Sequence, residues 1–297
     1  MRIGLTLPLA EGDTADGHTP DFAETLAFAA RAEAGGLDSV WVFDHLLFRF
    51  PDVPQEGVRE AWTTLSALGA LVPRVELGSL VMCSSFRNPA LMAKMAATLD
   101  DLSGGRVILG LGSGWHDPEY AAFGYPDDHK VGRFSEDLEI TARLMNSERL
   151  TMDGTWQQVT DAELVPPPER RVPILVAAKG PRMLRLTARW ADAWNTAWFG
   201  RVEDRLTSRL EDLQRACEDV GRDPASMRRT VGVRLHDPGD GADDSSGLDA
   251  DARGLADFFD ELAALGIDDA LVWSISKSAE ALDRIAEARR LHLAHAG

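Results

Sequence analysis

Cysteine and cationic residues are scarce in this chain, and each shortage excludes a class of protein. The 297 residues include two cysteines, Cys83 and Cys217, which are too few for a disulfide framework and too far apart for a metal-binding pair. Lysine and arginine number 31 against 48 aspartates and glutamates, a formal net charge of −17. Nucleic acids and anionic membranes are bound by basic surfaces, so we expect neither as a partner.

Long hydrophobic runs are also missing. No window approaches the roughly 18 uninterrupted apolar residues that a membrane-spanning helix needs, and residues 1–8 lack the apolar length of a signal peptide. With few cysteines, this predicts a soluble protein in a reducing, cytoplasmic compartment. The hydrophobic fraction of 44% is nevertheless enough for a sizeable core, and we expect a single domain over residues 1–297.

One glycine is missing from an otherwise familiar motif. The apolar run at residues 107–111 meets Gly110, Gly112 and Gly114 at alternate positions, which can let another molecule approach the backbone closely. A dinucleotide-binding fingerprint would need a further glycine three residues after Gly112, where this chain has Trp115. Another fold must therefore explain these glycines.

Apolar runs alternate with helical patterns along the whole chain. We predict strands at residues 3–8, 38–43, 76–82, 107–111, 174–177, 193–198, 230–235 and 270–273. We predict helices at residues 21–34, 61–72, 90–102, 133–146, 181–190, 203–220, 255–265 and 279–293. The strands are almost continuously apolar, as in parallel sheets covered on both faces. Eight such units without a repeated half favour a closed (β/α)8 TIM barrel over a doubly wound sheet.

Two segments interrupt this alternation. Residues 150–171 carry a hairpin signal at Asp153 and Gly154, followed by three consecutive prolines at 166–168. They predict an insertion between strands four and five. Residues 237–246 are acidic and glycine-rich, and we expect them to form a mobile loop.

Polar, aromatic and glycine residues follow the predicted strands, where TIM barrels carry their sites. They are Asp44 and His45 after strand two, Gly112 to His116 after strand four, Ala178 to Pro181 after strand five, Trp198 after strand six and His236 after strand seven. Two neighbouring glycine loops that lead towards helix starts suit the phosphate end of a cofactor. In so acidic a chain, an anionic ligand would need a local positive site of this kind.

An ordered set of sequence blocks resembles the bacterial-luciferase-like superfamily, and within it the coenzyme F420-dependent oxidoreductases. The blocks are GLDSVWVFDHL at 36–46, FRNP at 86–89, ATLD at 97–100, SGGR at 103–106, LGLGSGW at 109–115, FGYP at 123–126, GPRML at 180–184 and ADAWN at 191–195. Each block alone is weakly specific, but the set covers most of residues 1–200. The resemblance implies a (β/α)8 barrel with an insertion, in agreement with the independent strand count.

The resemblance also implies a cofactor site. The ring of a deazaflavin (F420) would lie over the end of strand three, where relatives often have a non-proline cis peptide, and Leu80 and Val81 hold the matching positions. Its phosphate end would lie between the loops after strands four and five, at Gly112, Ser113, Gly114, Ala177, Ala178, Lys179, Gly180 and Pro181.

The same resemblance assigns roles to two residues after strand two. His45 matches a catalytic acid/base of the sugar-phosphate dehydrogenase relatives, and imidazole exchanges protons readily near neutral pH. Asp44 matches an aspartate that helps to hold the deazaflavin. Those relatives carry a glutamate where this chain has Trp115, so their proton-transfer scheme does not carry over.

Four further residues are candidates for the substrate pocket: Trp115, His116, Trp198 and His236. A packing or solvated role is the alternative for each. The histidines lack close ligand spacing, and we expect no metal. We predict hydride transfer between F420 and a small organic substrate, in a homodimer. The alternatives are a reduced-FMN-dependent monooxygenase of the same fold and a non-catalytic flavin-fold binding protein.

Overall fold

Eight parallel strands close into a barrel in the computed structural model, which describes residues 1–14, 16–238 and 247–295. In ring order they are β1 (Arg2–Thr6), β2 (Ser39–Val42), β5 (Glu76–Ser79), β7 (Val107–Gly112), β10 (Ile174–Ala177), β11 (Ala193–Phe199), β12 (Arg228–His236) and β14 (Asp269–Ser274). Pairing of β7 with β10 and of β14 with β1 completes the ring. This confirms the predicted TIM barrel.

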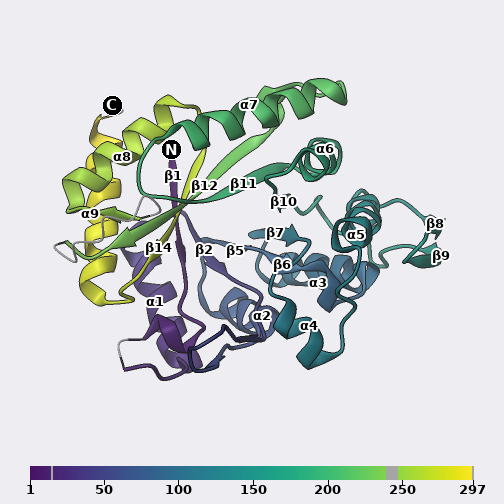
Figure 1. Ribbon diagram of the computed structural model, residues 1–297, viewed down its shortest axis with the longest axis horizontal. Helices are drawn as coiled ribbons and strands as arrows, with labels where there is room; N and C mark the ends of the chain where they lie inside the picture. The colour runs from purple at the N-terminus through teal and green to yellow at the C-terminus, as the bar shows by residue number, and fades with distance from the viewer. Residues whose placement is uncertain (15, 239–246, 296–297) are drawn as a thin grey trace.

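Helices between the strands surround the barrel (Figure 1). They are α1 (Phe22–Ala34), α2 (Ala61–Leu71), α3 (Pro89–Leu102), α5 (Lys130–Met145), α6 (Pro181–Trp190), α7 (Asp204–Asp219), α8 (Ala252–Ala264) and α9 (Ala279–His295). Helix starts follow local signals: the Asp21 carboxylate accepts from the N–H of Glu24, and the Glu24 carboxylate accepts from the N–H of Asp21, a capping box. In the described part of the chain, none of the helices is long and apolar enough to cross a membrane.

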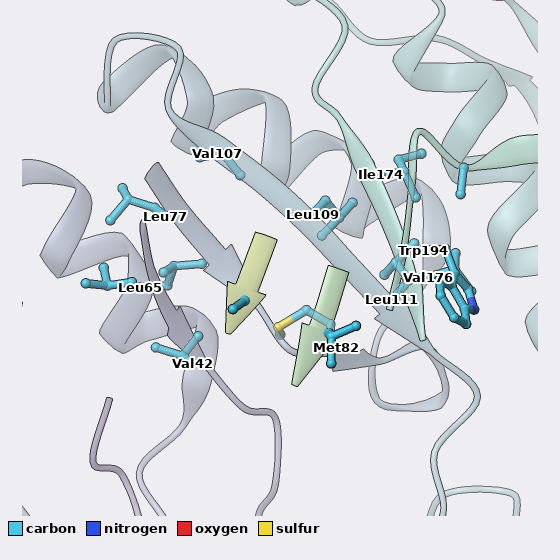
Figure 2. Packing of buried hydrophobic residues seen from close by; sticks show 14 of the residues in the cluster. Val42, Leu65, Leu77, Met82, Val107, Leu109, Leu111, Ile174, Val176 and Trp194 are labelled. Atoms are coloured by element: carbon cyan, nitrogen blue, oxygen red, sulfur yellow. The ribbon is translucent and has the colours of Figure 1, made fainter. Parts of the chain in front are cut away.

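The main core lies between the strands and the helices. Figure 2 shows alternate residues of β7, among them Val107 and Leu109, packed with Leu77 of β5, Ile174 of β10 and Leu65 of α2. Their neighbours in sequence point the other way, into the barrel, where a separate cluster is formed by Trp41, Ile108, Leu175, Ala193 and Leu271. This two-residue period explains why the strands read as continuously apolar.

The third barrel strand is interrupted. After β5 ends at Ser79, the chain forms a cis peptide bond between Leu80 and Val81 and resumes as β6 (Met82–Cys83), which pairs with β7. The non-proline cis bond expected at this place is thus present. A side chain at Gly110 would collide with the Ser79 carbonyl, so Gly110 makes room for the interruption.

Several short elements were not predicted. They are α4 (Asp117–Phe123), β3 (Leu47–Phe48), β4 (Glu56–Gly57), β13 (Leu248–Asp249), and the 3-10 helices η1 (Glu11–Asp13), η2 (Ser84–Phe86) and η3 (Pro224–Ser226). They are too short for an apolar period to reveal them. Of the expected mobile loop at 237–246, residues 239–246 lie outside the described residues.

The predicted insertion is a hairpin of β8 (Leu150–Asp153) and β9 (Gln158–Ala162), which lies between β7 and β10 in sequence. It projects beyond α5 at one end of the molecule (Figure 1).

Candidate functional site

A cavity of about 430 Å³ opens at the ends of β2, β6, β7, β10 and β11, and we call it the glycine-loop cavity. Most of the predicted cofactor and substrate residues line it: Asp44, His45, Leu80, Val81, Gly112, Ser113, Gly114, Trp115, His116, Ala177, Ala178, Lys179, Gly180 and Trp198. Barrel closure therefore brings together loops that lie far apart in sequence.

Two predicted site residues are not among the described residues that line this cavity. Pro181 is the exposed first residue of α6. His236 is buried at the end of β12, where its ring lies against Gly247. Their assignment to cofactor and substrate stays a prediction.

His45 is held by a carboxylate that sequence reasoning missed. Its Nδ1 lies 2.7 Å from Oε1 of Glu119 in α4, and the other Glu119 oxygen accepts a hydrogen bond of 2.5 Å from the N–H of Leu46. The Glu119 side chain is 1% exposed. A buried carboxylate bound to Nδ1 requires a proton there, which leaves Nε2 as the nitrogen available to a ligand. In the part of the chain that is described, the ring makes no other hydrogen bond.

Glu119 was missed because α4 was missed. The helix has a proline in its first turn, Pro118, and ends at Gly124, whose φ of 76° is left-handed. Proline at a helix start and glycine just after its end are recognised signals, so they were available in the sequence. What they could not reveal is that Glu119 faces His45, 74 residues earlier in the chain.

Asp44 is anchored to the protein itself. Its carboxylate accepts hydrogen bonds from the N–H of Cys83 at 2.9 Å and from Arg87 at 2.6 and 3.1 Å. The Asp44 side chain is fully buried, where a carboxylate persists only if it is paired and hydrogen-bonded. The bond to Cys83 ties the end of β2 to β6, so this aspartate fixes the backbone from which His45 projects.

Cys83 itself is buried and inert. Its sulfur lies 3.1 Å from the Tyr120 hydroxyl, and burial raises the pKa of the Cys83 thiol to about 11. It therefore remains a thiol at neutral pH and is a poor nucleophile.

The glycines of the site do two different things. A Cβ on Gly112 would lie 2.6 Å from the Val81 side chain, and one on Gly114, whose φ is +75°, would meet Tyr120 and Cys83. At both positions the protein's own atoms fill the room that a glycine leaves. By contrast, no described atom lies within 4 Å of a Cβ built on Gly180. Gly180 is therefore the glycine that leaves open space for a ligand.

A cluster of cations surrounds the start of α6. Gly180 is the N-cap of this helix and contributes no side-chain cap, so N–H groups of its first turn remain for an anion. The pKa of the neighbouring Lys179 is lowered, first by partial burial of the ammonium and then by Arg209 and Arg205. In a chain of net charge −17, Lys179 and Arg209 form the local positive site that an anionic ligand needs, whereas Arg205 is paired with Glu203 at 2.6 Å.

A second cavity, of about 570 Å³, adjoins the first, and we call it the aromatic cavity. The two share the lining residues His45, Leu80, Trp115 and Trp198. Four of the eleven remaining lining residues are aromatic: Phe43, Phe48, Phe50 and Trp273. His45 thus lies at the junction of the two cavities.

Trp115 and His116 have neighbouring rings, 5.1 Å apart between centroids, but differ in burial. Trp115 is 62% exposed, and its ring is 5.3 Å from that of His45. His116 is buried, and its Nε2 accepts a 3.0 Å hydrogen bond from the N–H of Arg49. Burial lowers the pKa of His116, which suits a neutral ring whose Nε2 accepts a hydrogen bond from the backbone. This histidine joins the loop after β7 to the loop after β2.

The barrel with its interrupted third strand and the glycine loops at its mouth define the class. The chain belongs to the luciferase-like monooxygenase family, whose model matches residues 1–290.

Particular relatives narrow the comparison. An F420-dependent glucose-6-phosphate dehydrogenase of Amycolatopsis mediterranei is 32% identical over 221 residues, which cover 71% of this chain and 64% of that protein. A phthiodiolone/phenolphthiodiolone dimycocerosates ketoreductase of a Mycobacterium species (strain JLS) is 36% identical over 231 residues, covering 70% of this chain and 60% of that protein. The chain therefore spans less than two thirds of the length of these relatives.

The solved structure of an F420-dependent secondary alcohol dehydrogenase, in complex with an F420–acetone adduct, superimposes with a TM-score of 0.80 over 98% of both chains. Its sequence is 20% identical to this one, so the likeness concerns the fold.

Proposed function

We propose that this chain is an oxidoreductase that transfers a hydride between coenzyme F420 and a small organic substrate. The observation that carries the proposal is the His45–Glu119 pair, which presents one ring nitrogen at the junction of two cavities. The F420-dependent activities named for the relatives support the choice of cofactor.

The residues present fit such a cofactor. F420 combines a flat ring with an anionic, phosphate-bearing tail. The space beside Gly180, the start of α6 and the cations Lys179 and Arg209 would hold the anionic end. Leu80 and Val81 would supply an apolar surface for the ring.

When bound, F420 supplies or accepts two electrons as a hydride. His45 would take up the proton of a substrate hydroxyl through Nε2, or return it in the opposite direction. Glu119 holds Nδ1, and so orients the ring and stabilises its charged form. Asp44 positions the backbone that carries His45. With a substrate bound against them, the aromatic walls would reduce the access of water to the reacting groups.

A titration tests the cofactor. Purified protein is titrated with F420 and, separately, with FMN, while quenching of cofactor fluorescence is followed. We expect low-micromolar binding of F420. Binding of FMN without F420 would instead support the reduced-FMN monooxygenase, and binding of neither would support a non-catalytic role.

The assembly and compartment are further parts of the proposal. We expect a homodimer packed through early helices, since Leu71 of α2 and Leu91 and Leu102 of α3 are large, exposed apolar side chains on helices that contact each other. Both cysteines are buried free thiols, which is compatible with a reducing cytoplasm.

A further inference from the structure

The aromatic cavity has a composition that selects a class of substrate. Six of the residues that line it are phenylalanine or tryptophan, and they come from the ends or following loops of β2, β7, β11 and β14. Its volume of about 570 Å³ is within the range of small-molecule sites. Surfaces of this kind favour apolar bodies, and especially aromatic rings, which pack against other rings at separations of about 4.5–7 Å.

The rings form two facing groups. On one side, Phe50 stacks on Phe48 at 6.0 Å and on Trp115 at 6.3 Å between centroids. On the other, Trp198 and Trp273 lie 5.2 Å apart. Phe50 and Trp115 are 42% and 62% exposed, a large apolar area to leave in contact with water. An apolar molecule between the groups would cover part of it.

The charges of this cavity do not favour an anion. Its described lining contains two carboxylates, Asp13 and Glu56, and one cation, Arg234, while the Lys277 ammonium lies 3.9 Å from Asp13. Arg234 already lies over the Trp273 ring, at 5.6 Å from its centroid. The cationic cluster at Lys179 lies instead at the far loop of the glycine-loop cavity, where the cofactor would occupy it. A phosphorylated or carboxylated substrate would therefore meet an apolar wall with no excess of positive charge to offset its desolvation.

His45 places a proton-accepting group beside the aromatic cavity. It lines both cavities, so a polar oxygen bound to Nε2 would have the aromatic cavity behind it. Resting on the function proposed above, we infer that the substrate is an uncharged alcohol, or the corresponding ketone, with an apolar body of aromatic size. Oxidation of the alcohol removes a hydride from carbon, for which the cofactor is the acceptor, and a proton from oxygen, for which His45 is the acceptor.

A matched pair of ketones tests this inference. Acetophenone and benzoylformate share a phenyl ketone and differ in a methyl group against a carboxylate. Their binding to protein loaded with oxidised F420, which cannot reduce them, is measured by calorimetry, with glucose 6-phosphate as a third probe. We expect acetophenone to bind at least about tenfold more tightly than either anion. Equal or tighter binding of benzoylformate or glucose 6-phosphate would overturn the inference.

Substitutions in the wall of the aromatic cavity test whether acetophenone binds there. Phe50→Ala should weaken acetophenone binding about tenfold, and Phe50→Leu by less, because leucine keeps most of the apolar volume. Phe123→Ala is the control, since Phe123 is similarly exposed, at 52%, and lines neither cavity. Glu56→Gln should narrow the preference for acetophenone over benzoylformate severalfold. Unchanged acetophenone affinity in Phe50→Ala would place the ketone elsewhere and contradict the proposal.

Two further measurements distinguish failure of the proposed substrate class from failure of the proposed cofactor. F420 affinity is measured by fluorescence on the same samples, and circular dichroism checks that each variant is folded. F420 binding without acetophenone binding would overturn the substrate class and leave the proposed cofactor standing. Absence of F420 binding would overturn the proposed function, whatever the ketones do.

Discussion

At the scale of single residues, the proposed chemistry depends on one pair of side chains, His45 and Glu119. Glu119 is buried and makes two hydrogen bonds, one to the His45 ring and one to the backbone of Leu46. The second bond fixes the carboxylate, so the first fixes the ring. His45 can then exchange a proton through Nε2 without rotating.

Removal of His45 should therefore affect turnover more than binding. His45→Ala is expected to lower kcat about 100-fold or more, which is the scale of general acid–base catalysis, while F420 affinity changes less. Glu119→Gln should lower kcat by a smaller factor, because an amide can still accept from Nδ1 but cannot stabilise a charged ring. Steady-state kinetics and fluorescence titration measure the two quantities. An unchanged kcat in His45→Ala would show that His45 takes no part in catalysis.

Lys277 is a second residue with a measurable consequence. Its ammonium is buried, donates a 3.0 Å hydrogen bond to the carbonyl of Thr6 and lies 3.9 Å from Asp13. Burial lowers the pKa of Lys277 to about 8. Below pH 8 the amine is charged in both the folded and the unfolded chain, so the folded protein bears the whole cost of burying the charge. As the pH rises from about 8 towards the unfolded pKa, that cost disappears and stability rises.

We therefore expect Lys277→Met to stabilise the protein at pH 7 by about 1–3 kcal/mol, after allowance for the lost hydrogen bond. The advantage should shrink by about 2 kcal/mol between pH 7 and pH 9.5, since each pH unit above the folded pKa is worth about 1.4 kcal/mol. Urea denaturation of both proteins at the two pH values measures it. A variant that is less stable than the parent at pH 7 would show that the amine is adequately solvated or paired.

At the scale of elements, the glycine loops owe their sequence to two different requirements. Gly110 and Gly112 follow from the interruption of the neighbouring strand, because the Ser79 carbonyl and the Val81 side chain occupy the space beside them. Gly180 instead opens the start of α6 to solvent. The same residue type thus serves packing in one loop and access in the other.

A matched pair of valine substitutions separates these roles. Gly112→Val should push on Val81 and destabilise the fold by about 1–3 kcal/mol, as overpacking usually does. Gly180→Val should change stability by about 1 kcal/mol or less and weaken F420 binding, because it fills the open space. Thermal melts and F420 titrations are compared for both. Undiminished F420 affinity in Gly180→Val would show that the anionic end of F420 does not bind beside the start of α6.

At the scale of the whole molecule, charge and assembly are the main questions. The net charge of −17 disfavours nucleic acid and anionic surfaces as partners, and we expect anion binding at the cations beside Gly180. An acidic surface also favours solubility. The exposed leucines on α2 and α3 are exceptions, because they place large apolar side chains on that surface. Burial of these side chains in a homodimer would remove them from water.

The dimer prediction can be tested by sedimentation. Leu91→Asp with Leu102→Asp should shift the protein from dimer to monomer, because each aspartate would be buried without a partner. Val220→Asp is the control, since Val220 follows α7 and is 39% exposed. A parent protein that sediments as a monomer would refute the dimer outright.

The barrel itself was determined by local sequence. Apolar runs, helix caps and the spacing of units are properties of neighbouring residues, so β10 and α6 were predicted with the same bounds that the structure has. The glycine pattern after the predicted strands located the two glycine loops, and the resemblance to known family blocks located the cis peptide at Leu80 and Val81. Short elements such as α4 escaped because they contain too few residues for a period.

Only the tertiary structure decided which side chains meet. Glu119 and His45 are 74 residues apart, and Phe50 faces Trp198 and Trp273 across one cavity only because the barrel closes. Closure also decided that Gly112 faces Val81 whereas Gly180 faces open space. A sequence pattern reports on neighbours along the chain, while the partner of a histidine and the walls of a pocket depend on contacts between distant segments. The sequence by itself therefore determined the scaffold and the loops of the site, and the fold determined how those loops are arranged around a ligand.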